Sequence, residues 1–91
     1  MPYIDQEIRK ELDKEIDNLI TILPRTLRSD VRDGDVNYVI TRIIDGLYSN
    51  KDYSHYSRAL GVLEAVKLEY YRRKIVLYEI LKLQENKDVY K

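Results

Sequence analysis

The strongest constraint on the fold is a long stretch of helix-compatible sequence, from residue 54 to about residue 84. It contains no proline, and Gly61 costs a helix only about 1 kcal/mol relative to alanine. About 30 helical residues rise roughly 45 Å, whereas a compact chain of this length has a diameter of about 30 Å. Either the helix bends near Gly61 or its far half is covered by another subunit, and we expect the second.

Two shorter helices are predicted before this stretch, over residues 5–23 and 35–48. Asp5 is placed to cap the first helix, which Pro24 ends, and Asp35 is placed to cap the second. Their apolar residues recur every three or four positions, as on one face of a helix. These are Ile8, Leu12, Ile16, Leu19, Ile20 and Leu23 in the first, and Val36, Val39, Ile40, Ile43, Ile44 and Leu47 in the second.

The segments between the helices lack this periodicity. Residues 24–34 mix proline, glycine and charge, which predicts a connection with a short turn around Leu27 and Val31. Asp52 or Ser54 is expected to cap the long helix. The sequence therefore predicts an all-α fold with a single domain over 1–91, in which helices over 5–23 and 35–48 pack on a long helix over 54–84, a polar tail covers 85–91, and copies assemble as a helical homo-oligomer.

The charges balance overall but are unevenly distributed. Lysine and arginine number 16, as do aspartate and glutamate, so the net charge is zero. Proteins that bind duplex nucleic acid usually carry a basic excess, which makes that function unlikely here. Residues 1–23 hold six acids and three bases, whereas residues 49–91 hold nine bases and six acids. One end of the chain is therefore expected to attract the other, or another subunit.

The composition also restricts the environment of the protein. There is no cysteine, which excludes disulfides and thiolate metal sites. The first residues are charged and include no apolar run, so neither a signal peptide nor a membrane span is expected. We expect a cytoplasmic protein.

The aromatic residues are unusual, because all nine are tyrosines. Tyrosine suits half-covered places where the ring is buried and the hydroxyl finds a partner. Two tyrosines and four cations lie in the segment LEAVKLEYYRRK, residues 63–74. At about 100° per residue, five residues of the long helix form one stripe about 60° wide: Tyr56, Lys67, Tyr71, Lys74 and Tyr78. The candidate ligand-binding residues are Lys67, Tyr71, Arg72, Arg73, Lys74, Tyr78, Tyr90 and Arg42.

Two interpretations of this cluster stay open. In the first, the cations hold phosphate or carboxylate groups while tyrosine rings stack on a base. In the second, the stems of Lys67 and Lys74 lie over apolar surface, the tyrosines complete the core, and Glu69 pairs with Arg72 and Arg73.

No other residues form a recognisable chemical motif. Arg42 is expected to pair with Asp45 or another acid in a buried ion pair, and His55 to lie in a helix cap. The spacing of Asp30, Asp33 and Asp35 does not meet that of a calcium-binding EF-hand. Neither a nucleophile elbow nor a glycine-rich phosphate loop occurs. We therefore expect neither an enzyme nor a bound metal or cofactor.

The segments ITR (40–42), GVLEAVKLEYYRR (61–73) and ENKDVY (85–90) resemble those of a family of short, uncharacterised bacterial and phage proteins. The resemblance covers the C-terminal two thirds of the chain. Lys87 stands where that family usually has glycine, so a tight positive-φ turn is not expected there. The resemblance implies a phage or prophage origin and a function in binding.

The function predicted from these features is non-catalytic. We expect the protein to sequester a small anionic, nucleotide-like ligand, for example an immune signalling nucleotide of the host, at the junctions between subunits. The alternative is a structural or protein-interaction module that forms the same helical homo-oligomer without a ligand. A weaker alternative is binding of single-stranded nucleic acid along the tyrosine and lysine stripe.

Overall fold

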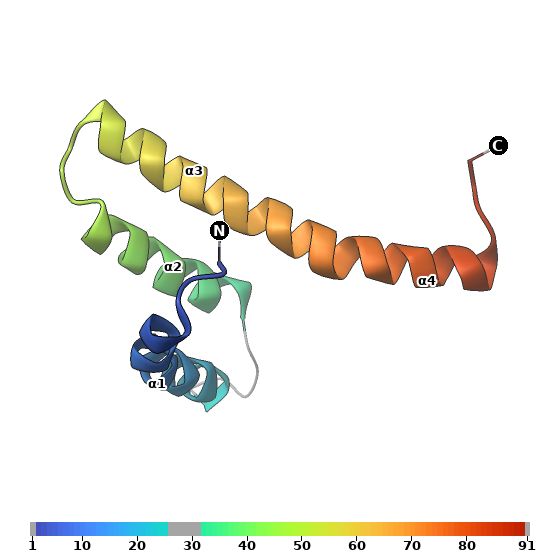
Figure 1. Cartoon of the computed structure of the whole chain (residues 1–91), viewed down its shortest axis with the longest axis horizontal. Coiled ribbons are helices and arrows are strands. Elements are labelled where there is room, and N and C mark those ends of the chain that lie inside the picture. The colour runs from blue at the N-terminus through green and yellow to red at the C-terminus, as the bar shows by residue number, and fades with distance from the viewer. Residues whose placement is uncertain (1, 26–31, 91) are drawn as a thin grey trace.

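The structure is all-α, as predicted, and its last helix is much longer than the others (Figure 1). It is a computed structural model that describes residues 2–25 and 32–90. The elements in chain order are α1 (Gln6–Ile22), a 3₁₀ turn (Leu23–Arg25), α2 (Asp33–Leu47), α3 (Tyr53–Tyr70), a π turn (Tyr71–Ile75) and α4 (Val76–Asn86). The last three are continuous and form one long helix from Tyr53 to Asn86.

Both ends of α1 agree with the prediction. The Asp5 carboxylate accepts a hydrogen bond from the Glu7 backbone N–H at 2.9 Å and so caps the helix. The α-helix ends at Ile22, and Pro24 lies in the 3₁₀ turn that follows. Proline cannot donate the backbone hydrogen bond that another α-helical turn would need, so the chain leaves the helix at this point.

The start of α2 differs from the prediction. The helix begins at Asp33 rather than after Asp35, and its N-cap residue is Arg32, which makes no side-chain capping bond. Asp33 and Asp35 both lie in the first turn, where a carboxylate interacts favourably with the positive end of the helix dipole. The charges of the two aspartates therefore favour the helix start. The turn predicted around Leu27 and Val31 lies outside the described residues.

The long helix begins at the predicted cap and is not interrupted at Gly61. The Asp52 carboxylate accepts a hydrogen bond from the His55 backbone N–H at 2.9 Å and lies 3.0 Å from Nδ1 of the His55 ring. His55 thus lies in the cap region, as expected, with Asp52 as the capping residue. The irregularity in this helix lies at Tyr71–Ile75 instead, where the backbone forms a π turn.

The helix ends at Asn86. The backbone conformation of the next residue, Lys87, differs from the one expected from the sequence. Lys87 has φ 67° and ψ 159°, a conformation that is essentially restricted to glycine. The chain thus makes the positive-φ turn even though lysine occupies the position. This turn directs residues 88–90 away from the helix axis (Figure 1).

The helices are arranged in an open shape. In Figure 1, α2 runs antiparallel to α3, α1 lies below α2, and α4 continues from α3 and extends beyond α1 and α2. The radius of gyration is 17.3 Å, whereas a compact chain of this length has about 12 Å. Among the described residues, Ala59 alone is buried, with 7% of its surface exposed. In the described part of the chain, the shorter helices therefore accompany the long one without enclosing a core.

None of the helices in the described part of the chain is long and apolar enough to cross a lipid bilayer.

The cap at Asp52 predicts a specific dependence of stability on pH. Hydrogen bonds from His55, first from its backbone N–H and then from its side chain, lower the pKa of Asp52 below its ordinary value. A carboxylate with a lowered pKa stabilises the folded state above its ordinary pKa, and this contribution is lost as the pH falls through the lowered value. Asp52→Asn keeps a capping side chain but removes the titrating carboxyl group. We therefore expect the variant to lose less stability than the wild type as the pH falls from about 5 to about 2.

Thermal unfolding followed by circular dichroism across this range measures the effect. Asp13→Asn, on the exposed surface of α1, is the matched control. An unchanged pH profile for Asp52→Asn would contradict the assigned role of this cap.

Candidate functional site

A polar network joins the N-terminal segment to the middle of the long helix. The Tyr3 hydroxyl donates to Glu69 Oε1 at 2.6 Å and accepts from Arg73 Nη1 at 3.0 Å. Arg72 Nη2 donates to both oxygens of Glu69, at 2.9 and 3.1 Å. A residue from the start of the chain thus connects Glu69, at the end of α3, with Arg73, in the π turn.

The network also sets the charge state of its members. The hydrogen bond from Tyr3, followed by the bond from Arg72, lowers the pKa of Glu69 below its ordinary value. The same carboxylate raises the pKa of Arg72. Glu69 is therefore ionised at neutral pH, and its carboxylate interacts with Tyr3 and Arg72 of the same chain.

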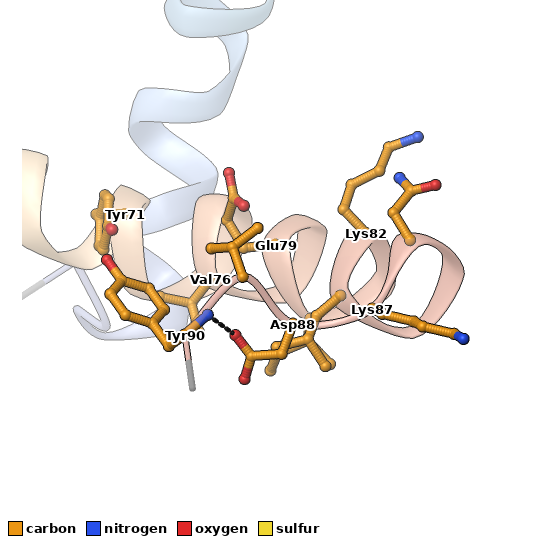
Figure 2. Close-up of a pocket in the computed structure, with 11 residues that line it drawn as sticks. Tyr71, Val76, Glu79, Lys82, Lys87, Asp88 and Tyr90 are labelled. Carbon is orange, nitrogen blue, oxygen red and sulfur yellow. Dashed lines mark hydrogen bonds between the residues drawn. The ribbon is translucent and has the colours of Figure 1, made fainter.

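The second feature is an open hollow along α4 with a volume of about 530 Å³. Figure 2 shows the side chains that line it, with Tyr71 and Tyr90 towards the same end of the view. The tail after Lys87 forms one wall, and the backbone N–H of Tyr90 donates to Asp88 Oδ1 at 2.8 Å within it. The lining residues are Tyr71, Val76, Glu79, Ile80, Lys82, Leu83, Asn86, Lys87, Asp88, Val89 and Tyr90.

The π turn changes which residues share a face of the long helix. A π turn holds one more residue than an α-helical turn, so the residues after it are rotated by about 100° relative to an uninterrupted α-helix. Tyr78 follows the turn and is rotated out of the stripe predicted for Lys67 and Tyr71. It lies instead beside Lys82, whose Nζ is 5.6 Å from the centre of the Tyr78 ring.

The remaining candidates lie apart from the hollow. Lys67 is exposed, with Nζ 3.8 Å from Glu64 Oε1, and Lys74 is exposed within the π turn. Arg42 is also exposed, which corrects the prediction of a buried ion pair. Its Nη1 donates to the Tyr38 hydroxyl at 2.9 Å, one turn earlier on α2.

The eight candidates thus separate into several groups. Tyr71 and Tyr90 line the hollow, and Arg72 and Arg73 join the network of Tyr3. Lys67, Lys74, Tyr78 and Arg42 belong to neither. In the described part of the chain, no group of three or more acidic, histidine or cysteine side chains is placed to hold a metal ion.

The network contains one residue that sequence reasoning missed, which is Tyr3. It precedes the first helix, so no periodicity marks it, and its partners lie 66 and 70 positions away. The pairing of Glu69 with Arg72 was among the interpretations of the sequence, because these residues are three positions apart on a helix. The pairing of Glu69 with Arg73 is replaced by the bond from Arg73 to Tyr3.

A family model described as Domain of unknown function (DUF6899) matches residues 1–89. The chain belongs to this family. The match covers both shorter helices and, except for Tyr90, the C-terminal segments from which a family resemblance was inferred. No curated protein and no solved structure matches the chain. The family description states no activity, so the function of this DUF6899 member is argued from its own geometry.

The network predicts that the Tyr3 hydroxyl controls the titration of Glu69. Tyr3→Phe removes the hydrogen bond that contributes most to the lowered pKa and keeps the aromatic ring. We expect the pKa of Glu69 to rise towards its ordinary value, because the carboxylate then keeps the bond from Arg72 and the charges of Arg72 and Arg73 but loses its largest stabilising contact. Side-chain carboxyl chemical shifts, followed by NMR as a function of pH, measure this change.

Tyr53→Phe is the matched control, because Tyr53 is a tyrosine with 85% of its surface exposed and lies at the start of the long helix, 16 positions before Glu69. The contact between Tyr3 and Glu69 would be refuted by an identical titration of Glu69 in the two variants.

Proposed function

We propose that this protein is a non-catalytic helical module that assembles with copies of itself through its long helix. The observation that carries the proposal is the surface that one chain leaves exposed, 8744 Å². A folded monomer of this mass exposes about 5,600 Å². The excess is about 3,100 Å² by the same scaling.

Part of the exposed surface is apolar and lies on α4. Leu77, Ile80, Leu81 and Leu83 expose 57, 47, 59 and 48% of their surfaces. They form a broad apolar face, with Tyr78, Lys82 and Glu85 on the opposite side of the helix. Covering one such leucine or isoleucine contributes up to about 1.5–3 kcal/mol, so a chain that leaves this face in water forgoes a large stabilisation.

The size of the excess favours an obligate assembly over a transient one. A standard interface buries about 800 Å² on each partner, and obligate interfaces bury more. The excess of about 3,100 Å² is several times the standard figure. Folding and assembly are then coupled, and the stability of the protein depends on its concentration.

A substitution on the apolar face tests the assembly. Ile80→Gln removes apolar surface from α4 without lowering helix propensity. We expect the dissociation constant to rise by about ten- to a hundredfold, because about 1.4 kcal/mol corresponds to a factor of ten. Sedimentation velocity over a concentration series measures it.

Glu85→Gln introduces the same side chain on the opposite side of α4 and should leave the assembly unchanged. A wild-type chain that remains a stable, well-folded monomer at micromolar concentration would overturn the proposal.

One observation favours a second candidate function, the binding of a small anionic ligand that contains a base. Two tyrosines, Tyr71 and Tyr90, line the same hollow as the cations Lys82 and Lys87. Aromatic rings stack on bases and ammonium groups attract phosphate, so this combination suits a nucleotide. Arg72 and Arg73 already bond to Glu69 and Tyr3, so in this proposal the lysines of the hollow provide the positive charge.

A thermal-shift panel of mono-, di- and cyclic nucleotides tests the second candidate. A ligand at 100 times its dissociation constant stabilises the folded state by about 2.7 kcal/mol, so a nucleotide that binds here raises the melting temperature. Tyr90→Ala should abolish the shift, whereas Tyr53→Ala, on a tyrosine outside the hollow, should retain it. If no nucleotide raises the melting temperature of the wild-type protein, the second candidate function is refuted and self-assembly is the proposed function that remains.

A further inference from the structure

We propose that α1 of a second copy is the element that covers the π turn and α4. The inference rests on the proposed self-assembly and names the two surfaces that meet in it. Both surfaces are amphipathic helices whose apolar side chains lie half exposed in the single chain. They differ in charge and agree in length.

The apolar stripe of α1 is as incompletely covered as that of α4. Ile8, Leu12, Ile16 and Leu19 recur at helical spacing and expose 49, 47, 46 and 38% of their surfaces. No residue of α1 is buried. In Figure 1, α1 lies below α2 while α4 extends away in a different direction. The α1 helix that reaches α4 therefore belongs to another copy.

The charges of the two surfaces are opposite. The segment Tyr71–Asn86 has four bases (Arg72, Arg73, Lys74 and Lys82) and two acids (Glu79 and Glu85), a net charge of +2. The helix Gln6–Ile22 has five acids (Glu7, Glu11, Asp13, Glu15 and Asp17) and three bases (Arg9, Lys10 and Lys14), a net charge of −2.

This difference in charge distinguishes α1 from α4 itself as the partner. Two α4 segments packed together would bring +2 against +2, and like charges in an interface are unfavourable. Packing α1 on the π turn and α4 brings segments of opposite net charge together while their apolar stripes meet in the centre. Charge complementarity thus favours α1 over a second α4.

The dimensions of the two surfaces also agree. The helix α1 has 17 residues, and the π turn and α4 have 5 and 11, which together make 16. At about 1.5 Å per residue, the two segments are about 25 and 24 Å long. One α1 helix therefore covers the free half of the long helix from end to end.

Charge reversal on each surface tests this pairing. Glu11→Lys with Glu15→Lys, at the edge of the α1 stripe, changes the charge of that helix from −2 to +2. Arg72→Glu with Lys74→Glu, both within the π turn, changes the charge of the π turn and α4 from +2 to −2. Each double variant places like charges together, so each alone should assemble at least tenfold more weakly than the wild type.

An equimolar mixture of the two variants restores opposite charges at every contact. We expect the mixture to regain the molar mass of the wild-type assembly in light scattering, and added salt to weaken this recovery. All of the exchanged residues are good helix formers, and circular dichroism verifies that the variants remain helical.

Lys51→Glu with Arg58→Glu is the matched control. It makes the same change in total charge outside α1 and α4, so it should assemble like the wild type by itself. A mixture that stays dissociated, or variants that assemble like the wild type, would overturn the pairing of α1 with α4. If the pairing fails in either way but the wild type is still an oligomer, the proposed self-assembly remains valid. If the wild type is a monomer, the proposed self-assembly is itself refuted.

Discussion

The structure depends on one mismatch, which is that the long helix has more apolar surface than the rest of the chain covers. The helix runs from Tyr53 to Asn86, while α2 accompanies only its first half (Figure 1). Burial of apolar surface is the main favourable term in folding, and among the described residues a single chain buries only Ala59. The open shape, the half-exposed stripes and the proposal of self-assembly all follow from this mismatch.

Much of the fold was predictable because its signals are local. The apolar spacing in α1, the cap at Asp5 and the proline at position 24 mark a helix and both of its ends. Asp52 likewise marks the start of the long helix. The start of α2 was misjudged, because Asp33 and Asp35 stabilise a helix start through charge as well as through capping, and the sequence does not distinguish the two.

The candidate site was less predictable, because its geometry depends on features that helical periodicity does not describe. The projection that placed Tyr78 beside Lys67 assumed a regular α-helix, and the π turn invalidates that assumption. The contact of Tyr3 with Glu69 and Arg73 joins residues far apart in sequence and leaves no local signal. The conformation of Lys87 contradicts the preference of lysine, which is why a turn was not expected there.

The π turn at Tyr71–Ile75 has a consequence for the architecture of any assembly. Because it rotates α4 relative to α3, the two halves of one rod present their hydrophobic sides in different directions. In the proposed assembly, such a rod would engage neighbours around its circumference rather than along a single seam. The number of copies that one molecule contacts is thereby linked to the backbone hydrogen-bonding pattern of five residues in the middle of the rod.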